Sequence, residues 1–138
     1  MSESMKLMDI EQIAKTIHYG LLQYCETLKM NISGEYWDEC THWYKKTLMW
    51  NVDQVITGSP SMSPERTHEN WMTEQLVDGW KYAATYNEEK KEHPFMLPYR
   101  QLPDEGKGYV LLFLSMAKAA RKFIKENEDT ANEAGEGI

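Results

Sequence analysis

The sequence has few of the features that mark secreted, membrane-spanning or metal-binding proteins. Among 138 residues there are only two cysteines, Cys25 and Cys40, which is too few for a disulfide framework and favours a reducing compartment. The most apolar stretch, Val110 to Leu114, is far shorter than the roughly 20 residues that span a bilayer. No apolar run follows the first residues as it does in a signal peptide. We therefore expect a cytoplasmic protein with no membrane association.

Positive charge is scarce. The net charge is −7, and residues 126–138 contain five acidic side chains and no Lys or Arg. The rest of the chain has 15 basic against 17 acidic side chains, so it is almost neutral and has no long basic stripe. Binding to duplex nucleic acid needs clustered Lys and Arg, and we expect no nucleic-acid partner. Small anionic ligands remain open, because a few local cations are enough for them.

Motifs for catalysis, phosphate loops and calcium loops are absent from the sequence. His68-Glu69 begins like the HExxH motif of zinc proteases, but Met72 stands where the second histidine belongs. Cys40 and His42 are the only close Cys/His pair, and no second pair accompanies them to complete a structural zinc site. The sequence therefore predicts a protein that is not an enzyme and that needs no metal or other cofactor.

Apolar residues recur every three or four positions in several segments, which predicts an all-α, mainly helical fold of about four helices. The first helix is expected over residues 10–28, with Asp9 and Gln12 as a capping box at its start. The second is expected over residues 37–56, with Gly58 as the stop signal.

The third predicted helix starts at Ser63 as N-cap and Pro64 as first helical residue. Its apolar face would carry Trp71, Met72, Leu76 and Trp80. From residue 81 to 108 the helical pattern breaks up around three prolines, which predicts a long ordered loop with short extended pieces at 80–83 and 95–99. A loop of that length inside a domain usually has a function.

The fourth predicted helix covers residues 109–124, which show the most regular apolar stripe in the chain. Residues 126–138 are acidic and polar, so they have too little apolar surface to offset the entropy of ordering them. We therefore predict one domain over residues 1–125, followed by a disordered tail over 126–138.

The loop region combines flat aromatic rings with cationic or imidazole side chains. The aromatic candidates for a ligand site are Trp71, Trp80, Tyr82 and Tyr99. The candidates for meeting phosphate or ribose groups are Lys81, Lys91, His93 and Arg100. This mixture suits a planar anionic ligand such as a nucleotide. The alternative is that the aromatic residues only pin an irregular loop to the neighbouring helices.

Four short strings from this region are spaced in a specific order. They are His68-Glu-Asn-Trp71, Asp78-Gly-Trp-Lys-Tyr82, Lys91-Glu-His-Pro94 and Leu97-Pro-Tyr99. Together they resemble the ryanodine-receptor (RyR) domain. The preceding half is similar to the version found in bacterial and phage proteins, and the residues that carry this likeness are Ile13, Ala14, His18, Tyr24, Cys25, Trp37 and Trp43. The resemblance spans about residues 10–126.

The resemblance implies helices packed around an elaborated loop and leaves open a pseudo-twofold relation between the halves. Ala83 and Ala84 replace the glycine that usually follows the family's tyrosine. Leu21 and Leu22 replace polar residues associated with the first helix, whereas the loop of the second half keeps its signature. We therefore place the candidate site in that loop.

Microbial members of the family are suspected sensors of nucleotide-derived signals, some of them in antiphage defence. By resemblance we expect a small ligand-binding module for a nucleotide-derived small molecule, acting as a sensor or as a sequestering protein, and encoded by a bacterium, phage or prophage. The alternative is a protein-protein interaction module without a small-molecule ligand, with a second copy of the chain among its candidate partners.

Overall fold

The computed structural model describes the backbone of residues 3–30 and 35–136, and the side chains of residues 10–30 and 35–128. Its main elements are the helices α1 (Glu3–Thr27), α2 (His42–Thr57), α3 (Pro64–Val77) and α4 (Asp104–Glu136). The predicted all-α fold is confirmed. No helix in the described part of the chain is long and apolar enough to cross a membrane.

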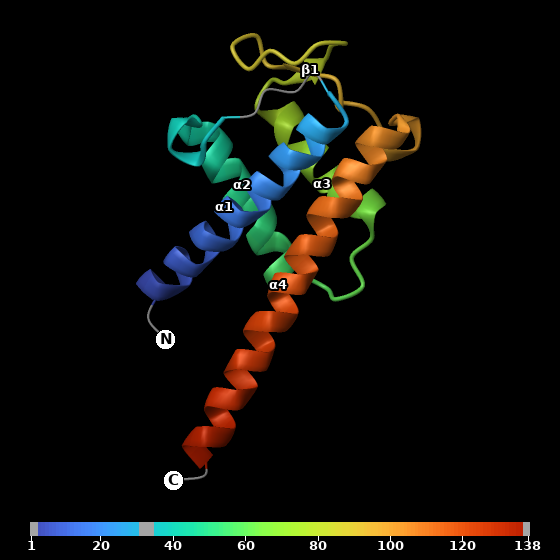
Figure 1. Ribbon diagram of the computed structural model, residues 1–138. Helices are drawn as coiled ribbons and strands as arrows, with labels where there is room; N and C mark the ends of the chain where they lie inside the picture. Colours follow the sequence, from blue (N-terminus) through green and yellow to red (C-terminus); the bar gives the residue numbers. More distant parts are fainter. Residues whose placement is uncertain (1–2, 31–34, 137–138) are drawn as a thin grey trace.

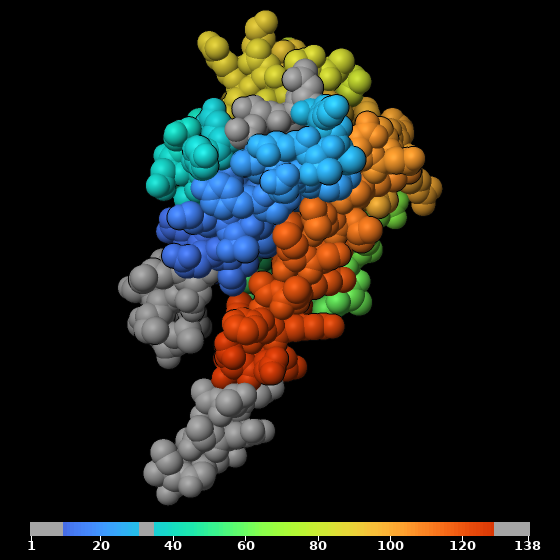
Figure 2. Space-filling view, in the orientation of Figure 1, coloured from blue at the N-terminus to red at the C-terminus, as the bar shows by residue number. Residues whose placement is uncertain are grey.

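Helices α1, α2 and α4 pack against one another, and α3 packs against α4 (Figure 1). The largest core cluster lies where the first three of these helices meet, and it includes Ala14, Ile17, Val52, Val55, Phe113 and Ala117. A second, smaller cluster is formed by Phe95, Leu102 and Val110, so it joins the loop after α3 to α4. In the space-filling view this loop covers the end of the molecule that lies away from the two termini (Figure 2).

The predicted start of the first helix is wrong. Helix α1 begins at Glu3, so Asp9 lies inside the helix and does not cap it. Residues 3–8 include Glu, Met, Lys and Leu, which are good helix formers and extend the helix upstream of the periodic apolar stripe.

The predicted second helix is divided in the structure. Trp37–Glu39 form a short 3-10 helix, η1, and α2 starts only after Thr41. The Thr41 hydroxyl accepts a hydrogen bond from the backbone N–H of Tyr44 at 3.2 Å, so it is the N-cap that sets this start. The predicted stop is confirmed, since Gly58 is the C-cap.

Helix α3 starts as predicted, because the Ser63 hydroxyl caps it by accepting from Arg66 N–H and Pro64 follows at once. Its predicted apolar face is partly wrong. Leu76 is 56% exposed, and the fully buried positions are Thr67, His68 and Gln75. Trp80 lies beyond the helix, which ends at Val77.

A Schellman turn causes this end. Gly79 has a φ of +92°, its N–H donates to Leu76 C=O, and the N–H of Trp80 donates to Gln75 C=O at 2.9 Å. The turn sends Trp80 back into the protein, where only 3% of it is exposed. A similar turn ends α1, where Lys29 has a φ of +56° and the N–H of Met30 donates to Cys25 C=O.

Both halves of the chain contain the same histidine contact. Nε2 of His18 lies 2.6 Å from Glu35 C=O, and Nε2 of His68 lies 2.7 Å from Leu97 C=O. Each carbonyl shortly precedes a 3-10 helix, η1 in the first half and η2 (Tyr99–Gln101) in the second, and each 3-10 helix leads into a long helix. The two halves therefore share a unit of helix, Schellman turn, histidine contact, 3-10 helix and helix, while a pseudo-twofold relation between them in space stays a prediction.

The two copies differ mainly in the length of the connection. His18 and Glu35 are 17 residues apart in sequence, whereas His68 and Leu97 are 29 apart. The longer connection contains the strands β1 (Lys81–Tyr82) and β2 (Glu92–His93), which pair in parallel. The predicted extended piece at 80–83 is confirmed by β1. The one predicted at 95–99 is wrong, because Phe95 lies in a turn after β2 and Tyr99 begins η2.

Helix α4 is longer than predicted at both ends. Its first turn holds Gly106 and Gly108, which interrupt the apolar pattern and hid the true start at Asp104. The predicted disorder of residues 126–138 differs from the structure, because the backbone continues as a helix to Glu136 (Figure 1). Residues 137 and 138 lie outside the described part. The domain boundary at residue 125 stays a prediction.

Candidate functional site

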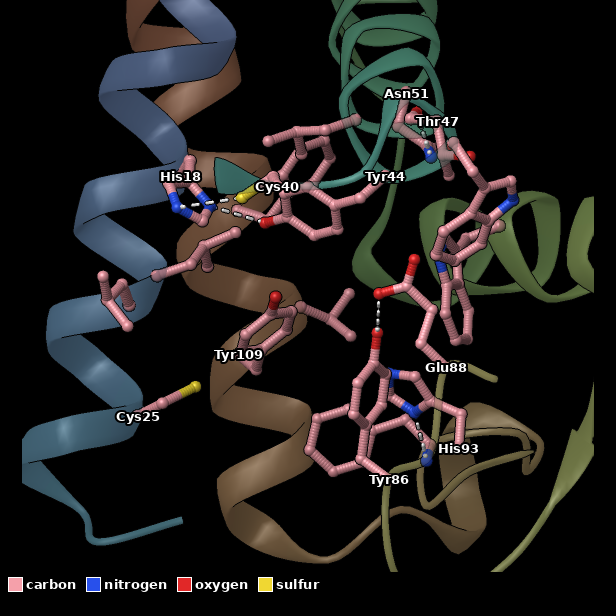
Figure 3. A pocket seen from close by; sticks show the side chains of 18 of the residues that line it. His18, Cys25, Cys40, Tyr44, Thr47, Asn51, Tyr86, Glu88, His93 and Tyr109 are labelled. Carbon is pink, nitrogen blue, oxygen red and sulfur yellow. Dashed lines mark hydrogen bonds between the residues drawn. The ribbon is translucent and has the colours of Figure 1, made fainter. Parts of the chain in front are cut away.

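A cavity of about 160 Å³ lies where all four helices and the long loop meet (Figure 3). This volume far exceeds the space that one water molecule needs. Helices α1 and α2 contribute His18, Leu21, Leu22, Cys25, Trp43, Tyr44, Thr47, Leu48 and Asn51. Helices α3 and α4 contribute Thr67, His68, Trp71, Tyr109, Val110 and Phe113. Loop residues complete the wall, namely Glu35, Cys40, Thr41, Tyr86, Glu88, His93 and Phe95.

Stacked aromatic rings support one side of the cavity. The ring of Trp80 lies 4.7 Å from that of Trp43 and 6.1 Å from that of Tyr86, and both contacts are stacked. Trp43 and Tyr86 line the cavity, whereas Trp80 lies between them and outside the lining. The stack therefore joins helix α2 to the loop, and Trp80 holds the two wall residues in place.

His93 lies at the centre of a second aromatic group. Its ring contacts the rings of Trp71, Trp80, Tyr86 and Phe95 at centroid distances between 5.1 and 6.3 Å. Burial in this apolar environment, with a smaller contribution from His68, lowers the pKa of His93 to about 3. The Phe95 N–H also donates to Nδ1 of His93 at 2.9 Å, so that nitrogen acts as an acceptor. His93 is therefore a neutral ring near pH 7.

Three tyrosine hydroxyls differ in their hydrogen bonding. Tyr44 OH lies 2.7 Å from Nδ1 of His18, and Tyr86 OH donates to a Glu88 oxygen at 3.2 Å. The hydroxyl of Tyr109 has no hydrogen-bond partner among the described residues, and it is turned toward the cavity (Figure 3). Burial raises the pKa of Tyr109 well above its usual range, so the group stays protonated and can both donate and accept. It is a free hydrogen-bonding group for a ligand.

Glu88 is anchored by hydroxyl groups. One carboxylate oxygen accepts from Thr41 Oγ1 at 2.5 Å and the other from Tyr86 OH at 3.2 Å. Thr41 is the N-cap of α2, so these bonds tie the loop to the start of that helix. Among the described residues, Glu88 forms no ion pair with a Lys or Arg.

The structure brings only part of the predicted site together. Of the eight predicted residues, Trp71 and His93 line the cavity and Trp80 lies directly behind its wall. Tyr99 packs against the second core cluster, with the Lys107 ammonium 5.9 Å from its ring centroid. Tyr82 is exposed on β1.

The three predicted cations lie outside the cavity lining. Lys81 is exposed on β1. Lys91 donates to the backbone carbonyl of Asp78 at 2.7 Å, and its ammonium is 3.6 Å from the Asp78 carboxylate. Arg100 pairs with Glu65 at 3.1 Å, and its side chain is 87% exposed. The role in phosphate binding predicted for these residues stays a prediction, and it would require a site on the outer surface.

Sequence reasoning missed the contribution of the first half. His18, Leu21, Tyr44 and Asn51 come from α1 and α2, yet they form a large part of the wall. One signal could have identified them. His18 precedes its 3-10 helix as His68 precedes the other, so a search for the repeat would have placed the two histidines at one site.

The described residues contain no group of three or more His, Cys, Asp or Glu side chains arranged to hold a metal ion. The thiol of Cys40 lies 3.8 Å from Nε2 of His18. Burial, followed by the negative charge of Glu35, raises the pKa of Cys40. The thiolate that metal binding or nucleophilic attack would need is therefore disfavoured.

A comparison with protein families gives a match. The model of the RyR domain matches residues 44–125, which is more than half of the chain. The chain belongs to the RyR domain family. The matched span runs from α2 through α3 and the long loop into α4. Helix α1 lies outside it, although this helix supplies part of the wall of the cavity in this RyR domain.

Proposed function

We propose that this RyR domain is a binding module for a small organic molecule with a flat ring, which occupies the cavity between the four helices. The observation that carries the proposal is the composition of the wall. Aromatic rings from α2, α3, α4 and the loop surround it, and the Tyr109 hydroxyl is available for bonding. Ligand pockets typically combine such apolar walls with a few convergent polar groups.

The ligand class that we propose is a nucleotide-derived molecule, entering with its base or nucleoside part. A flat base suits the rings of Trp71, Tyr86 and Tyr109. No Lys or Arg is among the described residues that line the cavity, so phosphate groups have no cationic partner inside it. A ligand with phosphates would have to keep them at the rim or outside.

A sensor or a sequestering protein is the role that we propose for such a module. The support is the small size of the chain and its likeness to bacterial and phage members of the family, which also suggests a setting in the cytoplasm and in antiphage defence. We propose binding without catalysis. This is supported by the raised pKa of Cys40, which keeps the thiol nearest to a histidine protonated.

Filling the cavity tests the proposal. Thr47 lines the cavity from α2, and Thr47→Phe would place a ring in the space of the ligand. We expect binding of a ligand found in a nucleoside and nucleotide panel to weaken by about tenfold or more, equivalent to about 1.4 kcal/mol. The measurement is ligand-observed NMR titration, with a thermal shift as a second readout.

The matched control is Thr57→Phe, because Thr57 is an exposed residue of the same helix that lies outside the cavity lining. Equal loss of binding in both variants would contradict a ligand in this cavity. If no compound of the panel binds while the protein sediments as a stable dimer, the protein-interaction alternative replaces the proposal.

A further inference from the structure

The charge of the cavity wall limits the ligand further. We infer that the ring part of the ligand that enters this cavity carries a positive charge, as an N-alkylated base does, and that this charge lies between the Glu88 carboxylate and the aromatic rings. The inference rests on the proposed function, because it concerns the same cavity. It adds the sign of the charge, which the aromatic character of the wall alone does not give.

The charges of the cavity wall are unbalanced. The described residues that line the cavity include the acidic residues Glu35 and Glu88, and no Lys or Arg. Glu35 is exposed, so the carboxylate that concerns a bound molecule is that of Glu88. His93 does not compensate its charge, because burial keeps the ring neutral near pH 7. Burial also lowers the pKa of His68. The wall beside Glu88 is therefore acidic, and an anionic group inside the cavity would be repelled.

The Glu88 carboxylate is held by two hydrogen bonds. Thr41 and Tyr86 each give one hydrogen bond to a separate oxygen of this carboxylate. Thr41 is the N-cap of helix α2, so the carboxylate lies at the start of that helix. The two hydrogen bonds orient the negative charge but do not neutralise it, since none of these donors carries a full charge. A ligand cation would supply the missing partner.

Aromatic rings line the cavity together with Glu88. Tyr86 touches Glu88 directly, and the rings of Trp43, Trp71 and Tyr109 line the same cavity (Figure 3). The face of an aromatic ring attracts a cation, and several rings around one site form the aromatic cages that bind alkylated ammonium groups. A carboxylate beside such rings favours a cation over a neutral molecule of the same shape.

The electrostatic environment of Cys40 is also negative. Cys40 lines the cavity next to Glu35, and burial is the largest cause of its raised pKa. The negative charges of Glu35, Glu88 and Glu39 raise this pKa further, while Lys45 acts in the opposite direction. The acidic side chains near Cys40 thus act together to disfavour its ionised form.

Three probes with one ring skeleton test the inference on the wild-type protein. They are 1-methylnicotinamide, a cation, nicotinamide, which is neutral, and nicotinate, an anion. We expect the cation to bind about tenfold more tightly than the neutral ring, and the anion to bind most weakly. The measurement is ligand-observed NMR titration at low ionic strength, where electrostatic preference is least screened.

Glu88→Gln identifies the residue responsible. The amide oxygen of glutamine can accept from one of the two hydroxyls, and its NH2 group can donate to the oxygen of the other. Both contacts of the loop anchor can therefore be kept while the charge is removed. We expect the preference for the cation over nicotinamide to fall to about twofold or less. The matched control is Glu89→Gln, since Glu89 is its exposed neighbour and lies outside the cavity lining, and it should keep the preference.

Each result decides one question. Equal binding of the cation and the neutral ring, or an unchanged preference in Glu88→Gln, would overturn the cationic ligand but leave the cavity as a binding site. No binding of any probe would also overturn it. The proposed function itself fails separately, through the cavity-filling variant. Because the probe series needs only the wild-type protein, the inference stays testable if Glu88→Gln does not fold.

Discussion

Trp80→Ala is expected to lower the free energy of unfolding by about 3–5 kcal/mol, the usual loss when a buried tryptophan is cut to alanine. Only 3% of Trp80 is exposed, and its ring is stacked between Trp43 and Tyr86. Removing it would leave a void and separate the loop from α2. Chemical denaturation followed by circular dichroism measures the loss.

Trp50→Ala is the control for this substitution. Trp50 is also on a helix, α2, but it is 41% exposed. A partly exposed side chain loses less transfer energy and leaves no cavity, so we expect a cost of at most about 1 kcal/mol. Similar losses in the two variants would show that the stack does not anchor the loop.

Acid is expected to destabilise the protein with a slope of up to about 1.4 kcal/mol per pH unit for each buried neutral histidine. The pKa of His93 is lowered to about 3, and that of His68 is lowered as well, both mainly by burial. In the unfolded chain these histidines titrate near 6.5, so below that pH the unfolded state binds more protons. Their contribution to stability is therefore complete above pH 6.5 and is lost as the pH falls toward 3.

The measurement is the free energy of unfolding in denaturant at pH values from 7 to 4.5. His93→Asn keeps an acceptor near the position of Nδ1 for the Phe95 N–H and removes the titrating ring. We expect the slope of the unfolding free energy against pH to decrease by the amount that corresponds to nearly one proton. This expectation does not depend on the absolute stability of the variant. His42→Asn is the control, because His42 is exposed on α2 and should leave the slope unchanged. An unchanged slope in His93→Asn would refute this assignment.

The local signals in the sequence predicted what they directly control. The Ser63 and Pro64 start of α3 and the Gly58 stop of α2 agree with the structure, because caps act within one turn of the helix. The end of α3 was missed. Trp80 fits the helical spacing, but the Schellman turn at Gly79 removes it from the helix and buries it elsewhere.

The candidate site was predicted only in part, for a similar reason. Trp71 and His93 were found because they belong to a recognisable string in one half of the chain. Tyr44 and Asn51 come from a helix far away in sequence, and no local pattern tells which side of that helix faces a cavity. The sequence does not show that Asp78 and Glu65 pair with Lys91 and Arg100, so it could not tell whether these cations are available to a ligand.

The unequal lengths of the two connections have a consequence for how this fold can change. The longer one is fixed at both ends, by the turn at Gly79 and by the contact between His68 and Leu97. Doubling a loop costs only about 0.6 kcal/mol in closure entropy. The segment between these two points can therefore be exchanged or lengthened in its exposed and half-buried parts, provided that its buried residues Trp80, Phe95 and Met96 are kept. The helical frame keeps its geometry, while the exchanged residues, among them Tyr86 and Glu88, give the cavity a new selectivity.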